Sequence, residues 1–141
     1  MKSSRIILIA GCIGFAAGSW WLLCHTPAKP EYARITLQNE QLQRDYLAQY
    51  GQTTAEEPPV KLEIRLPKGG SSQIYNTYCQ LQTTQQLPLS EYEGQNAVVW
   101  TYTLEGCSTH RAELICSPDG LLLGAMLYDS TEPYYMYPVI T

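Results

Sequence analysis

The clearest pattern in the chain is a strict alternation of apolar and charged residues over positions 60–66. The apolar residues Val60, Leu62, Ile64 and Leu66 are separated by Lys61, Glu63 and Arg65. A period of two residues is typical of a β-strand that has one wet face and one apolar face. Because Pro58-Pro59 precedes the run and Pro67 ends it, we expect a strand from Val60 to Leu66.

The last third of the chain shows strand patterns in three further segments. They cover residues 98–104, 111–116 and 121–128 and are rich in β-branched, aromatic and aliphatic residues. Ser117-Pro118-Asp119-Gly120 places proline and glycine where a tight turn needs them. We therefore expect an antiparallel meander of three strands in this region.

Two segments have the spacing of amphipathic helices. In the first, from about Thr36 to Tyr50, an apolar stripe falls on one face, Gln43 lies on the opposite face, and Gly51 can end the helix. The stripe consists of Leu42, Tyr46 and Tyr50. The second runs from a capping Ser71 or Ser72 to about Gln85, with Ile74, Tyr78 and Leu81 on one face.

A different pattern precedes these elements, because the nineteen residues Ile6–Cys24 carry no charge. As a helix this run would be roughly 28 Å long, which matches the apolar thickness of a bilayer. Lys2 and Arg5 precede it, so the positive-inside rule predicts a cytoplasmic N-terminus and an extracytoplasmic C-terminal domain. We expect a single-pass protein of the cell membrane.

Three other features of this run stay open. Cys12 follows small residues and could be a lipidation site, although the apolar run continues beyond it. A signal peptide cut near Ala16-Ala17-Gly18 is another reading. Ala10, Gly14 and Gly18 recur every four residues, a pattern that allows two membrane helices to approach closely and form a homodimer.

Together these patterns predict an α+β fold with the element order αβαβββ. The domains are a cytoplasmic stub (1–5), a transmembrane helix (6–24), a linker (25–35) and an extracytoplasmic domain (36–141). In the last of these, two helices cover one face of a four-stranded, largely antiparallel sheet.

Charge narrows the range of partners. All 13 carboxylates lie beyond residue 24, whereas only 7 of the 9 Lys and Arg residues do, so the net charge there is 7 − 13 = −6. This balance opposes binding to nucleic acid. We expect the partner to be an envelope protein or a wall component.

The sequence offers little catalytic chemistry. Cys107 and His110 have the spacing of half a metal site, with Cys79 and Cys116 as conceivable completions, but the meander keeps Cys116 too far along its strand. Ser108, His110 and Asp119 have the residue types of a triad without a local signature. We therefore assign no catalytic, cofactor-binding or metal-binding residues and no cofactor.

The aromatic composition suggests a binding surface. Eleven tyrosines accompany a single phenylalanine, and Tyr134, Tyr135 and Tyr137 lie together near the C-terminus. Tyrosine combines a large apolar ring with a polar tip, which suits contact with glycans or proteins. The alternative is that this segment folds back and covers the domain.

Residues from about Tyr46 to Ala125 resemble the bacterial domain of unknown function 4830 family. The resemblance is carried by Tyr46-Leu47-Ala48 with Gly51, Pro59-Val60, Leu66-Pro67, Ile74-Tyr75 with Tyr78, Leu81-Gln82, Gln85, Leu89, Tyr92, Gly94, Tyr102 and Leu123-Gly124. The chain departs from the family pattern at residues 69–71 and 86–88. The resemblance implies an exported, membrane-associated domain and no particular activity.

We therefore expect a non-enzymatic accessory or protein-interaction domain of the bacterial cell envelope. The alternative is a module that binds wall glycan or a small molecule through its tyrosine-rich surface.

Overall fold

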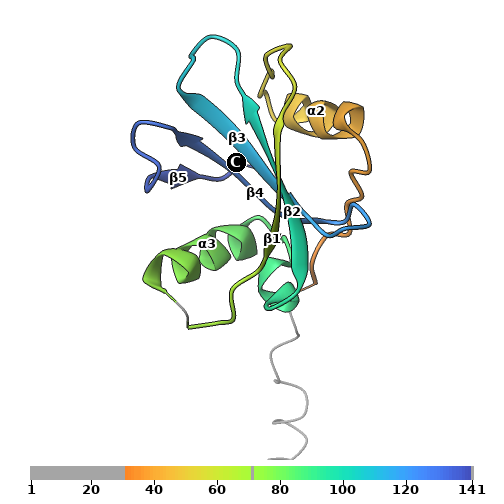
Figure 1. The fold of residues 1–141 in the computed structure, drawn as a ribbon, viewed down its shortest axis with the longest axis vertical. Helices are drawn as coiled ribbons and strands as arrows, with labels where there is room; N and C mark the ends of the chain where they lie inside the picture. The colour runs from red at the N-terminus through yellow and green to blue at the C-terminus, as the bar shows by residue number, and fades with distance from the viewer. Residues whose placement is uncertain (1–30, 71, 141) are drawn as a thin grey trace, which may run out of the picture. The chain divides into compact units, whose positions relative to one another are not determined.

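The computed structural model describes residues 31–70 and 72–140 (Figure 1). In chain order the elements are α2 (Glu40–Gln49), β1 (Val60–Arg65), α3 (Gln73–Thr84), the short 3₁₀ helix η1 (Leu89–Tyr92), β2 (Asn96–Thr103), β3 (His110–Cys116), β4 (Leu122–Asp129) and β5 (Met136–Tyr137). The predicted membrane run 6–24 lies outside the described residues, as do Ala10, Cys12, Gly14 and Gly18.

The strands form one antiparallel sheet in the order β1-β2-β3-β4-β5. Leu62 lies opposite Val99, and Trp100 lies opposite Leu114. The predicted meander is therefore present. Strand β1 pairs with β2, the first strand of the meander, and forms an edge of the sheet. The turn before β4 has Gly120 at φ +93°, a conformation that glycine adopts readily.

The predicted number of strands was wrong. The sheet has five strands rather than four, because Met136 and Tyr137 pair with Tyr128 and Leu127 of β4. The sequence pattern does not reveal this strand, because it is two residues long and lies between Pro133 and Pro138. The predicted fold class also included a transmembrane helix; among the described residues, none of the helices is long and apolar enough to cross a membrane.

The expected placement of both helices on one face of the sheet was also wrong. Tyr46 and Leu47 of α2 pack with Tyr102 and Leu114, whereas Tyr78 of α3 belongs to a second apolar cluster. That second cluster contains Val99 and Ile115, which point to the opposite face because side chains alternate along a strand. The two helices therefore cover opposite faces, as Figure 1 shows.

Helix α2 directs a different face toward the core than the sequence predicts. Gln43 is buried, at 1% exposure, while Leu42 is 41% exposed. The cause is the hydroxyl of Tyr102, which is buried against α2 and donates a hydrogen bond to Gln43 Oε1. A buried hydroxyl without a partner would cost free energy, so a polar side chain takes the inner position.

The loop between α2 and β1 is fixed by Arg44. Its guanidinium donates hydrogen bonds to Thr54 Oγ1 at 2.7 Å and to the carbonyl oxygens of Ala55 and Glu57 at 2.6 and 3.0 Å. The same group lies 5.0 Å from the ring centre of Tyr102. These contacts hold the chain in place just before β1 begins.

Helix α3 begins where the sequence predicts, with the Ser72 side chain accepting a hydrogen bond from the Tyr75 backbone N–H. Gln82 in this helix and Gln85 at its C-cap are buried beside β4. Gln82 Oε1 accepts from the Ala125 N–H at 2.8 Å, and Gln85 Nε2 donates to the Ala125 carbonyl at 2.8 Å. At Ala125 of β4, two glutamine side chains therefore form the backbone hydrogen bonds that a neighbouring strand would otherwise form.

Other segments cover the rest of the outer edge of β4. At one end Leu122 N–H bonds to the Ile35 carbonyl, and at the other end β5 pairs with β4. Gln85 Oε1 also accepts from the N–H groups of Val139 and Ile140, at 2.8 and 3.1 Å. The edge of the sheet at β4 is thus occupied along its length.

Candidate functional site

The predicted triad residues do not come together. Ser108 lies in the loop before β3 and His110 begins that strand, whereas Asp119 lies in the turn after it and accepts a hydrogen bond from Ser117. Ser117 follows His110 by seven positions of extended chain, which is roughly 24 Å at 3.4 Å per residue. This distance removes the only candidate triad that the sequence offers.

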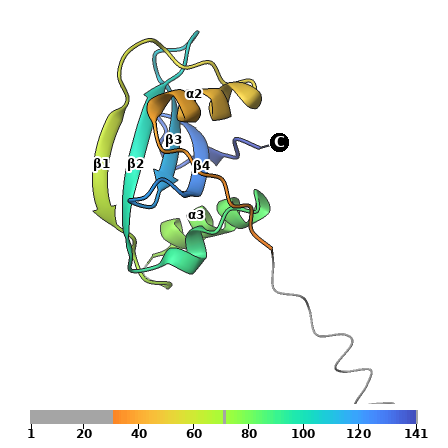
Figure 2. The ribbon, with the colours of Figure 1, turned by 90° about the vertical axis from the view of Figure 1, so that its right-hand side faces the viewer.

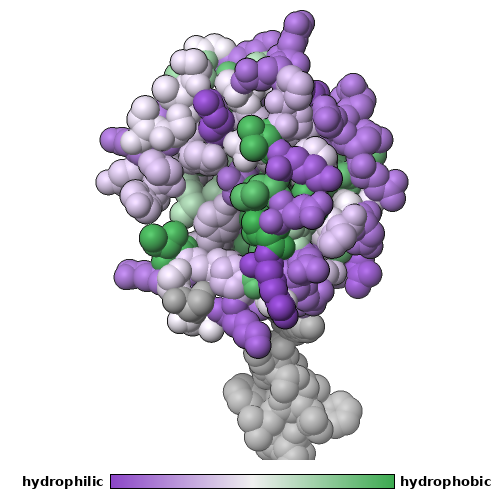
Figure 3. All heavy atoms as spheres, in the orientation of Figure 1, coloured by the Kyte–Doolittle hydropathy of each residue, from purple (hydrophilic) through white to green (hydrophobic). Residues whose placement is uncertain are grey.

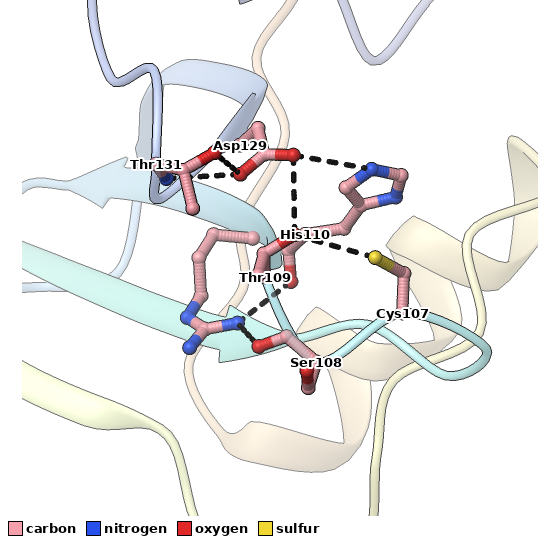
Figure 4. Close-up of polar contacts among 7 residues, drawn as sticks. Cys107, Ser108, Thr109, His110, Asp129 and Thr131 are labelled. Atoms are coloured by element: carbon pink, nitrogen blue, oxygen red, sulfur yellow. Dashed lines mark hydrogen bonds and ion pairs between the residues drawn. The ribbon is translucent and has the colours of Figure 1, made fainter.

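His110 instead meets an aspartate that the sequence analysis missed (Figure 4). Its Nε2 lies 3.7 Å from Asp129 Oδ2, and the Thr109 hydroxyl donates to the same oxygen at 3.1 Å. Asp129 also accepts from the backbone N–H and the hydroxyl of Thr131. Asp129 lies on β4, and its position opposite His110 depends on the register between β3 and β4. The sequence of β3 alone does not give that register.

Cys107 borders this cluster, with its Sγ 3.3 Å from Thr109 Oγ1. Hydrogen bonding with Thr109, through the side chain first and then the backbone, lowers the pKa of the Cys107 thiol. Hydrogen bonds from Thr131 likewise lower the pKa of Asp129. These contacts make a polar clamp between the loop before β3 and the end of β4.

The two cysteines that could complete a metal site with Cys107 and His110 lie elsewhere in the fold. Cys116 is buried in the core at 1% exposure, and Cys79 lies on α3, so neither joins Cys107 and His110. In the part of the chain that the structure describes, no three histidine, cysteine or acidic side chains are grouped to hold a metal ion. Cys79, Cys107 and Cys116 are free thiols.

The tyrosine-rich segment is partly folded back and partly exposed. Tyr137 pairs with Leu127 in the sheet, and Val139 is buried. The side chains of Tyr134, Tyr135 and Tyr137 are nevertheless 75, 66 and 59% exposed. The segment therefore folds back in part and leaves its three tyrosine rings exposed.

The largest departure from the sequence analysis is the exposure of β1. Val60 is 68% exposed and Leu62 is 58% exposed, although the alternating pattern predicts that they are buried. Figure 3 shows apolar side chains gathered over β1, bordered by hydrophilic ones. Helix α3 packs on the same face of the sheet, but nearer to β4. The part of this face at β1 is therefore uncovered.

The backbone of β1 is open as well. Figure 2 shows β1 as the outermost strand, and among the described residues β2 is the strand that pairs with it. The N–H and C=O groups of Leu66 bond to Gln95 and Gly94 at 2.8 and 3.0 Å. Because these groups alternate in direction along a strand, those of Lys61, Glu63 and Arg65 point away from the sheet.

The charged side chains of β1 lie on the face that α2 covers. The Lys61 ammonium lies 5.3 Å from the ring centre of Trp100, and Arg65 Nε donates to the Gly94 carbonyl at 2.8 Å. Charges on an edge strand discourage unselective pairing with other strands. Together with Pro58-Pro59, they were the signal in the sequence that this strand lies at an edge.

Searches with protein-family models, against curated proteins and against solved structures found no match to this chain. The resemblance to the domain of unknown function 4830 family therefore stays a prediction.

Proposed function

We propose that this chain is a protein-interaction domain of the bacterial cell envelope that binds its partner through the edge of β1. The observation that carries the proposal is the exposure of Val60 and Leu62 on a strand whose outer backbone groups are unpaired within the described residues. An extended segment of a partner can add to such an edge through backbone hydrogen bonds, while the apolar side chains supply contact area.

The contrast between the two edges of the sheet supports this proposal. The edge at β4 is covered by Ile35, by Gln82 and Gln85, and by β5. Exposed sheet edges promote aggregation, and folded proteins commonly cover them. A fold that covers one edge so fully and leaves apolar side chains on the other favours a binding role for the open edge.

The location in the envelope is proposed from the sequence. The uncharged run Ile6–Cys24, preceded by Lys2 and Arg5, supports placing the following domain outside the cytoplasm. The net charge of −6 beyond residue 24 supports a partner other than nucleic acid.

Site-specific photo-crosslinking in cells tests the interaction. A photoreactive amino acid at Leu62 should give a discrete crosslinked product, whereas the same amino acid at Gln49, which is exposed on α2, should not. The mass of the product separates a second copy of the chain from another protein. Equal labelling at the two positions, or none at Leu62, would contradict the proposal.

A second candidate function is recognition of wall glycan by Tyr134, Tyr135 and Tyr137, and their exposure favours it. A ligand that binds the folded form raises its melting temperature. Wall fragments should then stabilise the protein but not a variant in which Tyr134 and Tyr135 are alanine. Equal shifts for both proteins would exclude this surface.

A further inference from the structure

We infer that the edge of β1 pairs with β1 of a second copy of this chain, antiparallel, with the two Leu62 residues opposite each other. This inference rests on the proposed function, because it names the partner for the same edge. It follows from three properties of β1: the direction of its backbone groups, the order of its charges and the position of its apolar side chains.

Backbone direction limits the registers that two β1 strands can adopt. The outward N–H and C=O groups belong to Lys61, Glu63 and Arg65, because those of Leu66 point to Gly94 and Gln95. Two such edges bond only where an outward residue of one copy faces an outward residue of the other. Odd-numbered residues must therefore lie opposite odd-numbered residues.

The charges then select among these registers. With Leu62 opposite Leu62, Lys61 of each copy lies opposite Glu63 of the other, which gives two oppositely charged pairs. With Lys61 opposite Lys61, or Glu63 opposite Glu63, like charges face each other. In the latter case Lys61 also faces Arg65, so both registers are disfavoured.

One other register pairs opposite charges, with Ile64 opposite Ile64 and Glu63 opposite Arg65. It leaves Val60, which is more exposed than Leu62, without an opposite residue in the strand. The register centred on Leu62 instead keeps Val60 opposite Ile64 within the strand.

The apolar side chains fit the register centred on Leu62. Val60 of each copy lies opposite Ile64 of the other, and the two Leu62 side chains meet at the two-fold axis. Because residues opposite each other share a face, the apolar row of one copy continues into that of the other, and the charged rows meet on the opposite face. Pro59, opposite Arg65, ends the ladder at each side because it has no N–H group.

Exchange of the two charges tests the inference in the full-length chain, purified in detergent and measured by sedimentation velocity. Lys61→Glu and Glu63→Lys each convert both opposite-charge pairs into like-charge pairs. Each variant alone should dimerise at least about tenfold more weakly than the wild type, and an equimolar mixture of the two should form a heterodimer. Singles that dimerise like the wild type, or a mixture that stays monomeric, would overturn the inference.

Cysteine crosslinking reads the register directly and does not depend on charge. In a chain with serine at Cys12, Cys24, Cys79 and Cys107, Leu62→Cys should form a disulfide-linked dimer, because the paired Cα atoms lie about 4.5 Å apart. Lys61→Cys, Glu63→Cys and Ile64→Cys are the matched controls for the other registers. Faster crosslinking of any control than of Leu62→Cys would refute this register.

The two experiments separate failure of the inference from failure of the proposed function. If Leu62→Cys gives no covalent dimer while the photoreactive amino acid at Leu62 captures another protein, the self-pairing is wrong and the binding edge stands. If neither experiment gives a product, both are wrong. Unchanged far-ultraviolet circular dichroism of each variant confirms that it is folded.

Discussion

At the scale of single residues, the contact between Tyr78 and Glu113 joins α3 to the sheet. The Tyr78 hydroxyl donates a hydrogen bond to Glu113 Oε1. Burial raises the pKa of Glu113 above its ordinary value, although hydrogen bonds from Tyr78 and Tyr128 act in the opposite direction. The carboxyl group of Glu113 therefore lies where its charged form is disfavoured.

This raised pKa predicts a pH-dependent contribution to stability. Folded protein keeps the Glu113 proton to higher pH than unfolded protein, so the contribution is full below the ordinary pKa and is lost as pH rises through the folded pKa. Glu113→Gln lacks this titration. Its free energy of unfolding, measured with urea between about pH 4 and pH 7, should improve relative to that of the wild type as pH rises.

A constant difference between the two proteins across this range would show that Glu113 has the same pKa in the folded and unfolded states. Tyr78→Phe, which removes the donor, should destabilise the protein by about 1.5 to 3 kcal/mol at neutral pH. Tyr134→Phe is the matched control, because Tyr134 is 75% exposed, and it should change little.

At the scale of elements, the cover on β4 depends on the side chains of α3. Gln85 bonds at once to the Ala125 carbonyl and to the N–H groups of Val139 and Ile140. Gln85→Leu keeps a similar volume but leaves these groups without their partner. It should lower the free energy of unfolding by about 3 kcal/mol, because each unpaired buried polar group costs about 1 to 3 kcal/mol.

The same variant should speed hydrogen exchange at Val139 and Ile140, which mass spectrometry can follow. Gln80→Leu is the control, since Gln80 is exposed on the same helix and should change stability by less than about 0.5 kcal/mol. Unchanged exchange in Gln85→Leu would mean that the last strand is held by other contacts.

These glutamines also show what the sequence could and could not predict. Strands β1 to β4, the turn at Gly120 and a capping serine follow from local rules, and the structure has them. The inner faces of the helices do not follow from local rules. Gln43 and Gln82 are buried because they form hydrogen bonds with polar groups of strands that are distant in sequence. Periodicity treats polar residues as surface residues and therefore placed Gln43 on the outer face.

The candidate site was missed for a related reason. Alternation along β1 correctly predicted a strand but could not reveal that the apolar face near Val60 and Leu62 has no cover. Cover depends on where α3 lies relative to the strand, which is set by contacts between residues far apart in sequence. The pairing of His110 with Asp129 depends on register in the same way.

At the scale of the whole molecule, β2, β3 and β4 separate two apolar clusters, one under each helix. Leu122 and Leu123 are both fully buried, on opposite faces of β4, so each cluster depends on the same strand. We expect the described domain to unfold as one cooperative unit.

Thiol labelling checks this cooperativity. Cys107 is half-buried at the surface and has a lowered pKa, whereas Cys116 is 1% exposed in the core. A thiol reagent should modify Cys107 in the native protein and modify Cys116 at least about a thousandfold more slowly, through global unfolding. Peptide mass spectrometry separates the two sites.

Denaturant should accelerate labelling of Cys116 with the same dependence as global unfolding. If the labelling rate of Cys116 does not depend on denaturant concentration, the apolar cluster under α2 opens locally, without global unfolding. Cys79, whose pKa burial raises, should react more slowly than Cys107.

The bonds that join residues 33–37 to the rest of the domain also determine how it would respond to a pulling force. Ala33 N–H bonds to the Gln86 carbonyl, Leu37 N–H to Gly120, and Leu122 N–H to Ile35, at 2.9, 2.7 and 2.7 Å. Tension applied at residue 31 would therefore load the start of β4. Two strands, β2 and β3, lie between this point and β1, so the mechanical load and the open edge are at opposite sides of the sheet.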